Sequence, residues 1–167
     1  MPIIGIVAKE NESNFIKNAI KKNAKKNKFE IININKKSIE NIKNIKFDSI
    51  VICENVENFL NNSNYLENII DKANYIIVNL DKNQKFLKNK KDLITYGLNA
   101  KSTVTISSIK EESTLFCIQN EIKGNDENLV EEQEFIINIK KNNISKLYNS
   151  MAIFIVLLIY GEKIKKI

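Results

Sequence analysis

The sequence contains no histidine, arginine or tryptophan, and it has only four glycines and one proline among 167 residues. Without histidine, the chain lacks the most common general base and metal ligand of enzymes. Without arginine, it lacks the planar side chain that binds phosphate or guanine through paired hydrogen bonds. Because glycine and proline are scarce, long disordered linkers are not expected. We predict a single globular domain with its own core.

The net charge is +6, and all 26 cationic residues are lysines. Lysine occurs together with abundant asparagine and isoleucine, a combination typical of an AT-rich genome. The basic balance is therefore weak evidence for nucleic-acid binding, and we predict no nucleic-acid partner. The densest lysine run is most simply a solvated face. It comprises Lys21, Lys22, Lys25, Lys26 and Lys28.

The two cysteines lie in apolar runs, Cys53 in IVICE and Cys117 in LFCIQ. Since no C-x-x-C spacing is present, we expect buried, reduced thiols in a cytoplasmic protein. The first five residues lack a basic region before their apolar run, so no signal peptide is expected. The longest apolar run, residues 151–160, would rise about 15 Å as a helix, against a hydrocarbon core of roughly 30 Å. We predict no membrane span.

Apolar runs typical of buried strands alternate with helical patterns through the first 96 residues. We predict strands at residues 3–8, 29–34, 48–53, 75–80 and 93–96, and helices at residues 12–27, 38–45 and 63–72. Ser38 and Ser63 are the expected N-caps of the last two helices. This alternation builds right-handed βαβ units. The predicted fold class is α/β, with three layers and a mainly parallel, Rossmann-like or P-loop-like sheet.

The pattern changes within residues 92–109. The strand at 93–96 ends at Gly97, and β-branched residues from Thr103 onward open further strands without helix-length gaps. We predict strands at 102–108, 114–120 and 132–139, which form a small antiparallel three-stranded sheet, with a turn at 124–126. The single domain, residues 1–167, thus comprises a parallel α/β part (1–97), an antiparallel meander (98–140) and a closing helix (141–167).

The closing helix is predicted at residues 144–159, where Gly161 can terminate it. From Met151 onward it is apolar almost all round, so it must be buried on more than one side. Two arrangements fit this pattern equally well. Either the helix is completely buried beneath the antiparallel strands, or a partly exposed face marks contact with a protein partner or a second copy of the chain.

Two regions of the chain resemble the Mur ligase family, in its middle, ATP-binding domain. Residues 76–81, IIVNLD, are similar to the family's strand ending in Asn-x-Asp, and residues 94–104, ITYGLNAKSTV, look like its ITYGLN-x-A-x-V segment. Residues 148–152, YNSMA, are similar to its Asn-x-Leu-Ala helix start. The resemblance runs from about residue 75 to 161. It implies an ATP-binding fold, and complete members ligate an amino acid to a nucleotide-linked cell-wall precursor through an acyl phosphate.

The family's phosphate loop has no close counterpart here. The family holds phosphates in a glycine-rich loop after the first strand, with a lysine on the phosphates and a Ser/Thr on magnesium. In this sequence residues 8–13 read AKENES, with Glu12 at the lysine's position and Lys9 as a weak substitute. A carboxylate about 4 Å from a phosphate charge is repelled by roughly 4 kcal/mol at an effective dielectric of about 20. Ser145 and Lys146 replace the family's His-Asn pair. The resemblance thus implies a shortened relative with a degenerate P-loop.

Three residues carry the vestigial nucleotide contacts that the resemblance implies. Asn79 and Asp81 close the strand at 75–80 at its carboxyl end, where α/β proteins bind ligands, and Asn149 would contact an adenine-like ring. The structural alternatives are a side-chain–backbone turn for Asn79 and Asp81, and capping or orienting the closing helix for Asn149. Likewise, Glu10 and Glu12 form either a paired-carboxylate site or a solvated first helical turn favoured by the helix dipole.

We therefore predict a non-catalytic binding or assembly module linked to bacterial cell-wall (peptidoglycan) metabolism. It would have a protein partner or form a homodimer, and it would have no catalytic residue, metal site or cofactor. The first alternative is a weak ATP-binding protein, or a ligase component acting with missing domains, which would use ATP and magnesium. A lysine-driven nucleic-acid binder is a further alternative and requires steep salt dependence. Whether the chain is an enzyme stays open at this stage.

Overall fold

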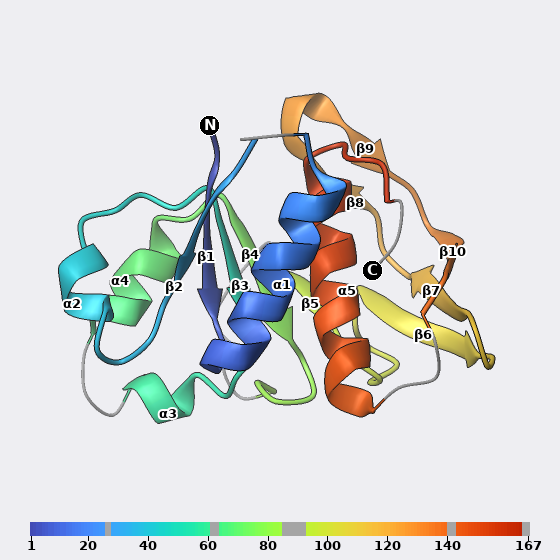
Figure 1. Ribbon diagram of the computed structural model, residues 1–167, viewed down its shortest axis with the longest axis horizontal. Helices are drawn as coiled ribbons and strands as arrows, with labels where there is room; N and C mark the ends of the chain where they lie inside the picture. The colour runs from blue at the N-terminus through green and yellow to red at the C-terminus, as the bar shows by residue number, and fades with distance from the viewer. Residues whose placement is uncertain (26–27, 61–63, 85–92, 140–142, 165–167) are drawn as a thin grey trace.

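The computed structural model describes residues 1–25, 28–60, 64–84, 93–139 and 143–164. These form an α/β fold, shown in Figure 1. The strands are β1 (Ile3–Val7), β2 (Glu30–Asn33), β3 (Ser49–Ile52), β4 (Tyr75–Asn79), β5 (Leu93–Tyr96), β6 (Val104–Ile109), β7 (Thr114–Ile118), β8 (Ile122–Lys123), β9 (Leu129–Val130) and β10 (Gln133–Ile137). The helices are α1 (Glu10–Asn23), α2 (Ile39–Ile42), α3 (Glu57–Leu60), α4 (Tyr65–Asp71) and α5 (Ile144–Ile159), with a 3₁₀ turn at Asn125–Glu127.

One mixed sheet organises the fold, with the strand order β10-β7-β6-β5-β4-β3-β1-β2. Strands β1 to β5 run parallel, and their alternating residues face two helical layers. Val51 and Ile77 pack with α1 and α5, whereas Ile50 and Ile76 pack with α2 and α4. Because β1, β3 and β4 are buried on both faces, their sequences are nearly continuous apolar runs. The predicted three-layer α/β fold with a mainly parallel sheet is confirmed.

The change of architecture lies where the sequence places it, after Gly97. Strand β6 pairs parallel to β5 through one residue pair, Tyr96 with Val104. Beyond that point β6, β7 and β10 pair antiparallel, with an irregularity between Ile106 and Ser108. These are the three predicted antiparallel strands, but they continue the large sheet instead of forming a separate one. The separate small sheet is the two-stranded β8-β9 hairpin.

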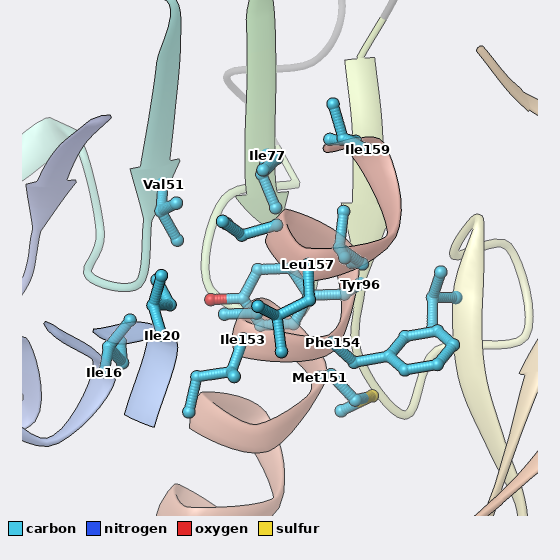
Figure 2. Packing of buried hydrophobic residues seen from close by; sticks show 14 of the residues in the cluster. Ile16, Ile20, Val51, Ile77, Tyr96, Met151, Ile153, Phe154, Leu157 and Ile159 are labelled. Atoms are coloured by element: carbon cyan, nitrogen blue, oxygen red, sulfur yellow. The ribbon is translucent and has the colours of Figure 1, made fainter. Parts of the chain in front are cut away.

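Helix α5 forms the centre of the larger core (Figure 2). Its side chains from Met151 to Leu157 are fully buried, and Ile159 is buried as well. The Phe154 ring packs edge-on between Phe116, at a centroid distance of 5.3 Å, and Phe135, at 5.1 Å. Of the two predicted arrangements, the structure therefore shows the apolar part of the helix buried, with Leu158 alone half-buried between Met151 and Tyr160. Within the described residues no helix is both long enough and apolar enough to cross a membrane.

Both ends of α5 are fixed by local hydrogen bonds. At its start, the Asn143 side chain accepts a 3.0 Å bond from the Lys146 backbone N–H. At its end, Gly161 has a φ of 64°, and the N–H groups of Gly161 and Glu162 bond to the carbonyls of Leu158 and Leu157. This is a Schellman motif, which requires a left-handed residue that glycine supplies without strain. The predicted termination at Gly161 is confirmed.

Several local predictions were wrong. Ser38 precedes α2, but its hydroxyl makes no capping bond, because it donates instead to the Asn33 carbonyl. The first helix begins at Glu10, two residues earlier than predicted, and the short helix α3 was missed. Cys53 is buried as expected, whereas Cys117 is only half-buried because it lies on the sheet face opposite α5. The predicted cap Ser63 lies outside the described residues.

Candidate binding groove

A groove opens at the carboxyl ends of the first three strands, with a volume of about 800 Å³. Ala8 follows β1, Asn33 ends β2, and Glu54 follows β3; all three line the groove. Strand β1 pairs with β2 on one side and with β3 on the other, so the chain reverses its direction across the sheet at this point. Ligands of open α/β sheets bind in such a crevice. The volume also lies within the range of small-molecule sites, roughly 300–1,000 Å³.

The groove is electropositive. Among the described residues, four lysines and two glutamates line it, giving a formal charge of +2. They are Lys9, Lys36, Lys37, Lys82, Glu10 and Glu54. The N-terminus of α1 also lies at the groove, because its N-cap residue Lys9 and first residue Glu10 are part of the lining. No side chain caps this helix end, so its free backbone N–H groups add partial positive charge.

Two asparagines fix the loops that form the groove walls. The Asn35 Oδ1 atom accepts 2.9 Å bonds from the backbone N–H groups of Lys37 and Ser38, which holds the turn after β2. The buried Asn83 side chain accepts a 2.8 Å bond from the Val56 N–H and donates bonds of 2.9 Å to the Glu54 carbonyl and 3.0 Å to the Asn79 carbonyl. The wall after β3 is therefore tied to the end of β4.

Asn33, a half-buried residue of the groove lining, has an enclosed and unsatisfied side-chain oxygen. Its Oδ1 atom is buried and has no hydrogen-bond partner among the described residues. Leaving a buried acceptor unpaired costs about 1–3 kcal/mol, and such groups are rare in folded proteins. Asn33 therefore differs from Asn35, whose side-chain oxygen is fully used in a turn.

The connection between β1 and α1 consists of two residues, Ala8 and Lys9. The two glutamates of the first helical turn do not share a site. Glu10 is exposed and lines the groove, whereas the half-buried Glu12 accepts a 2.7 Å hydrogen bond from the Ser145 hydroxyl of α5. Glu12 thus faces the larger core, and the paired-carboxylate alternative has no geometric support.

Asn79 ends β4 and is fully buried. Its Oδ1 atom accepts a 3.3 Å bond from the Lys82 backbone N–H, which forms the side-chain–backbone turn considered from sequence. Among the described residues, its Nδ2 atom is buried without a hydrogen-bond partner, and the same holds for the hydroxyl of Tyr96 on the neighbouring strand. Burial and the nearby Cys53 raise the pKa of the Tyr96 phenol well above its usual value.

Asp81 is fully engaged within the chain. Its carboxylate accepts hydrogen bonds from the backbone N–H groups of Leu98, at 2.7 Å, and Asn99, at 3.1 Å. The Tyr148 hydroxyl of α5 donates a third bond, of 2.9 Å. Partial burial and the Asp81 carboxylate raise the pKa of Tyr148 to about 12. Asp81 therefore links the loop after β5 to the first turns of α5.

Asn149 lies on α5 next to Tyr148 and is 6% exposed. The structure brings the start of α5 to the end of β4 through the bond between Tyr148 and Asp81. The three predicted contacts therefore lie in one region, where the end of β4 meets the start of α5; they are Asn79, Asp81 and Asn149. None of them is among the residues that line the groove described above. Within the described residues, no three acidic or cysteine side chains are grouped as a metal site.

The groove residues were missed from sequence. Asn33 is the last residue of the second strand, Lys36 and Lys37 lie in the turn after it, and Asn83 lies in the turn after the fourth strand. The available signal was position alone, since all four residues lie at or within four residues of the end of a parallel strand, at the edge where α/β ligands bind. Asparagine and lysine are so frequent in this chain that their types carried little information.

No protein-family model matches the sequence, and no curated protein matches it. Among solved structures, the chain is similar to UDP-N-acetylmuramate–alanine ligase from Thermotoga maritima, with a TM-score of 0.57, 12% identity and 93% of this chain covered. It is also similar to a pseudomurein peptide ligase type C from Methanothermus fervidus, with a TM-score of 0.61, 13% identity and 94% covered. The chain has a Mur-ligase-like fold.

This Mur-ligase-like chain matches 40% of the length of the first ligase and 47% of the second. At 12% and 13% identity, the likeness shows the fold alone. It agrees with the resemblance drawn from residues 76–81 and 94–104, which lie on β4, β5 and the start of β6.

Proposed function

We propose that this chain is a non-catalytic binding or assembly module related to the middle domain of Mur ligases and linked to cell-wall metabolism. The observation that supports it is the two-residue connection, Ala8 and Lys9, between β1 and α1. A P-loop needs several residues, including glycines, whose N–H groups surround the phosphates. Two residues without glycine cannot form that cradle, so we propose a degenerate phosphate site.

Electrostatics support the same proposal. Glu10 and Glu12 occupy the first turn of α1, at the helix end where a P-loop protein places phosphate. The Glu12 carboxylate is held by Ser145. Glu12 therefore supplies no cation where the family uses a lysine, and any carboxylate that came within about 4 Å of a phosphate charge would be repelled by roughly 4 kcal/mol at an effective dielectric of about 20.

The link to the cell wall comes from the structural neighbours. By name, one ligates UDP-N-acetylmuramate to alanine and the other is a pseudomurein peptide ligase. We transfer the association with such material and not the reaction, because the chain corresponds to less than half of either ligase. This part of the proposal rests on analogy of fold.

Calorimetric titration with magnesium ATP tests the non-catalytic role. We expect no micromolar binding to the purified chain. The weak ATP-binding alternative, with contacts from Asn79, Asp81 and Asn149, predicts micromolar binding that Asn149→Ala abolishes. Asn18→Ala, an exposed asparagine of α1, is the matched control. Binding that is lost in Asn149→Ala and kept in Asn18→Ala would overturn the proposal.

The assembly role is proposed to involve a second copy of the chain. Strand β10 ends the sheet, so one of its edges has no strand partner within the described residues. Ile136 on this strand is 73% exposed. An open edge with an exposed apolar residue can pair with the same edge of another molecule. Light scattering should show that the parent chain is a dimer and that Ile136→Lys dissociates it. Leu129→Lys, which changes an exposed leucine of β9, is the control and should leave the dimer intact. A monomeric parent chain would contradict this role.

A further inference from the structure

We propose that two copies of the chain join their sheets through β10 in a single register, in which Ile136 lies directly opposite Ile136 of the second copy. The inference rests on the edge-to-edge assembly proposed above and specifies which residues meet. The two strands run antiparallel about a twofold axis at this residue, so the sheet of one copy continues into the sheet of the other.

The direction of the β10 backbone follows from the hydrogen bonds of the neighbouring strands. Residues of an antiparallel strand direct their N–H and C=O groups alternately to one side and to the other. The Gln119 N–H donates a 2.8 Å bond to the Thr103 carbonyl, so Gln119, just after β7, directs its backbone groups to the β6 side. Phe116, three residues earlier, therefore directs its groups to β10, where it pairs with Phe135. Phe135 in turn faces β7, and the residues on either side of it direct their backbone groups to the free edge.

The free edge allows five symmetric registers, one for each residue of β10 on which the twofold axis can lie. An axis between two residues would place outward residues opposite inward ones, which cannot exchange backbone bonds. An axis at either of the first two residues of β10 brings glutamates opposite glutamates, which destabilises a sheet. An axis at Phe135 places Glu134 opposite Ile136, and an axis at the last residue places Asn138 opposite Ile136. Neither of these two registers gives Ile136 an apolar residue directly opposite.

An axis at Ile136 gives matched pairs from Glu134 to Asn138. The two copies of Ile136 face each other, and each Glu134 carboxylate lies opposite an Asn138 carboxamide, which can donate a hydrogen bond to it. On the other face of the sheet, each Phe135 lies opposite an Ile137. Apolar and hydrogen-bonded cross-strand pairs stabilise a sheet. The gain is large for Ile136, because it is 73% exposed in the single chain.

Ile136 also extends a row of apolar side chains. Phe135 packs on Phe154 of α5, so Ile136 lies on the opposite face of the sheet. There it pairs across strands with the half-buried Leu115 of β7. In the assembly the row runs from Leu115 through both Ile136 side chains to the second Leu115, and exposed apolar surface is removed from water.

Single-cysteine variants in a Cys117→Ser background test this register. Opposite residues that exchange both backbone bonds have Cα atoms about 5.5 Å apart, within the range of about 4.4–6.8 Å that a disulfide spans. Under mild oxidation by oxidised glutathione, Ile136→Cys should form a cross-linked dimer about tenfold or more faster than the control Leu129→Cys, an exposed position on β9. Thiols that face each other in an existing dimer have a far higher effective concentration than thiols that meet by diffusion. Circular dichroism checks that each variant is folded.

Two further positions distinguish the registers. Glu134→Cys alone should cross-link no faster than the control, because its two Cα atoms lie about 14 Å apart in this register, four residues of rise plus the strand spacing. Mixed with Asn138→Cys, it should give a heterodimer about tenfold or more faster than either variant gives a dimer alone, because the two residues lie opposite each other. Rapid cross-linking of Glu134→Cys alone would overturn the inference, as would a mixture of Glu134→Cys with Ile136→Cys that cross-links faster than Ile136→Cys alone.

The assembly role and its register fail separately. A monomeric parent chain in light scattering overturns the assembly role and the register together. A dimer in which Ile136→Cys cross-links no faster than Leu129→Cys overturns the register and leaves the assembly role standing.

Discussion

Removing the Asp81 carboxylate should destabilise the fold, because this side chain joins three parts of the chain. It accepts hydrogen bonds from the Leu98 and Asn99 N–H groups and from the Tyr148 hydroxyl. A hydrogen bond to an ionised group contributes about 1.5–3 kcal/mol. Leu98 is 45% exposed, so water replaces part of the lost interaction there. We expect Asp81→Ala to lower the free energy of unfolding by about 3 kcal/mol in total.

Urea unfolding followed by circular dichroism measures this loss. With a slope of about 2–3 kcal/mol per molar urea for a chain of this size, the midpoint should fall by about 1–1.5 M. Asp81→Asn keeps one acceptor and the side-chain volume, so its loss should be intermediate. Tyr148→Phe removes one hydrogen bond and should cost about 1 kcal/mol.

Glu111→Ala provides the matched control, because it removes an exposed carboxylate from the turn between β6 and β7. Its effect should stay within about 0.5 kcal/mol. If Asp81→Ala were no more destabilising than Glu111→Ala, the structural role of Asp81 would be refuted. Its carboxylate would then be available for a ligand, as the nucleotide-binding alternative requires.

Four further outcomes follow from burial. Phe154→Ala removes the ring packed between two other phenylalanines, and it should lower the free energy of unfolding in urea by about 3–5 kcal/mol. A decrease below about 1 kcal/mol, well under that of typical core deletions, would contradict this packing. Gly5→Ala would place a Cβ atom 2.6 Å from the Ile34 side chain, and it should lower the free energy of unfolding by about 1–3 kcal/mol. An unchanged urea midpoint would contradict this close packing. Burial raises the pKa of Cys53 to about 12, so a thiol reagent should label the half-buried Cys117 first in the native chain. Rapid labelling of Cys53 in a Cys117→Ser variant would contradict this order of labelling. Partial burial and the Asp81 carboxylate raise the pKa of Tyr148 from an ordinary 10.0 to about 12. The contribution of Tyr148 to folding stability is therefore complete below pH 10.0 and is lost as the pH rises towards 12. Ultraviolet titrations of the native chain and of Tyr148→Phe should differ by an ionisation near pH 12, and an ionisation difference centred near pH 10.0 would contradict this.

The sequence was sufficient for features that depend on neighbouring residues. Continuous apolar runs predicted the buried parallel strands, because strands covered on both faces carry no polar alternation. The break after Gly97 predicted where antiparallel pairing begins. Gly161 predicted the end of α5, since the left-handed residue of a Schellman motif is chosen locally. These features require only the period of side chains and the backbone freedom of single residues.

The tertiary structure decided everything that depends on distant partners. Whether α5 is exposed or buried could not be read from its own apolar residues, because the answer depends on Phe116, Phe135 and the β8-β9 hairpin closing over it. Asp81 could have been a ligand contact or an anchor, and the loop that folds back 17 residues later uses its carboxylate. The groove exists only because β1 lies between β2 and β3 in the sheet. Side-chain period cannot specify strand order, and strand order decides which loops meet at one edge.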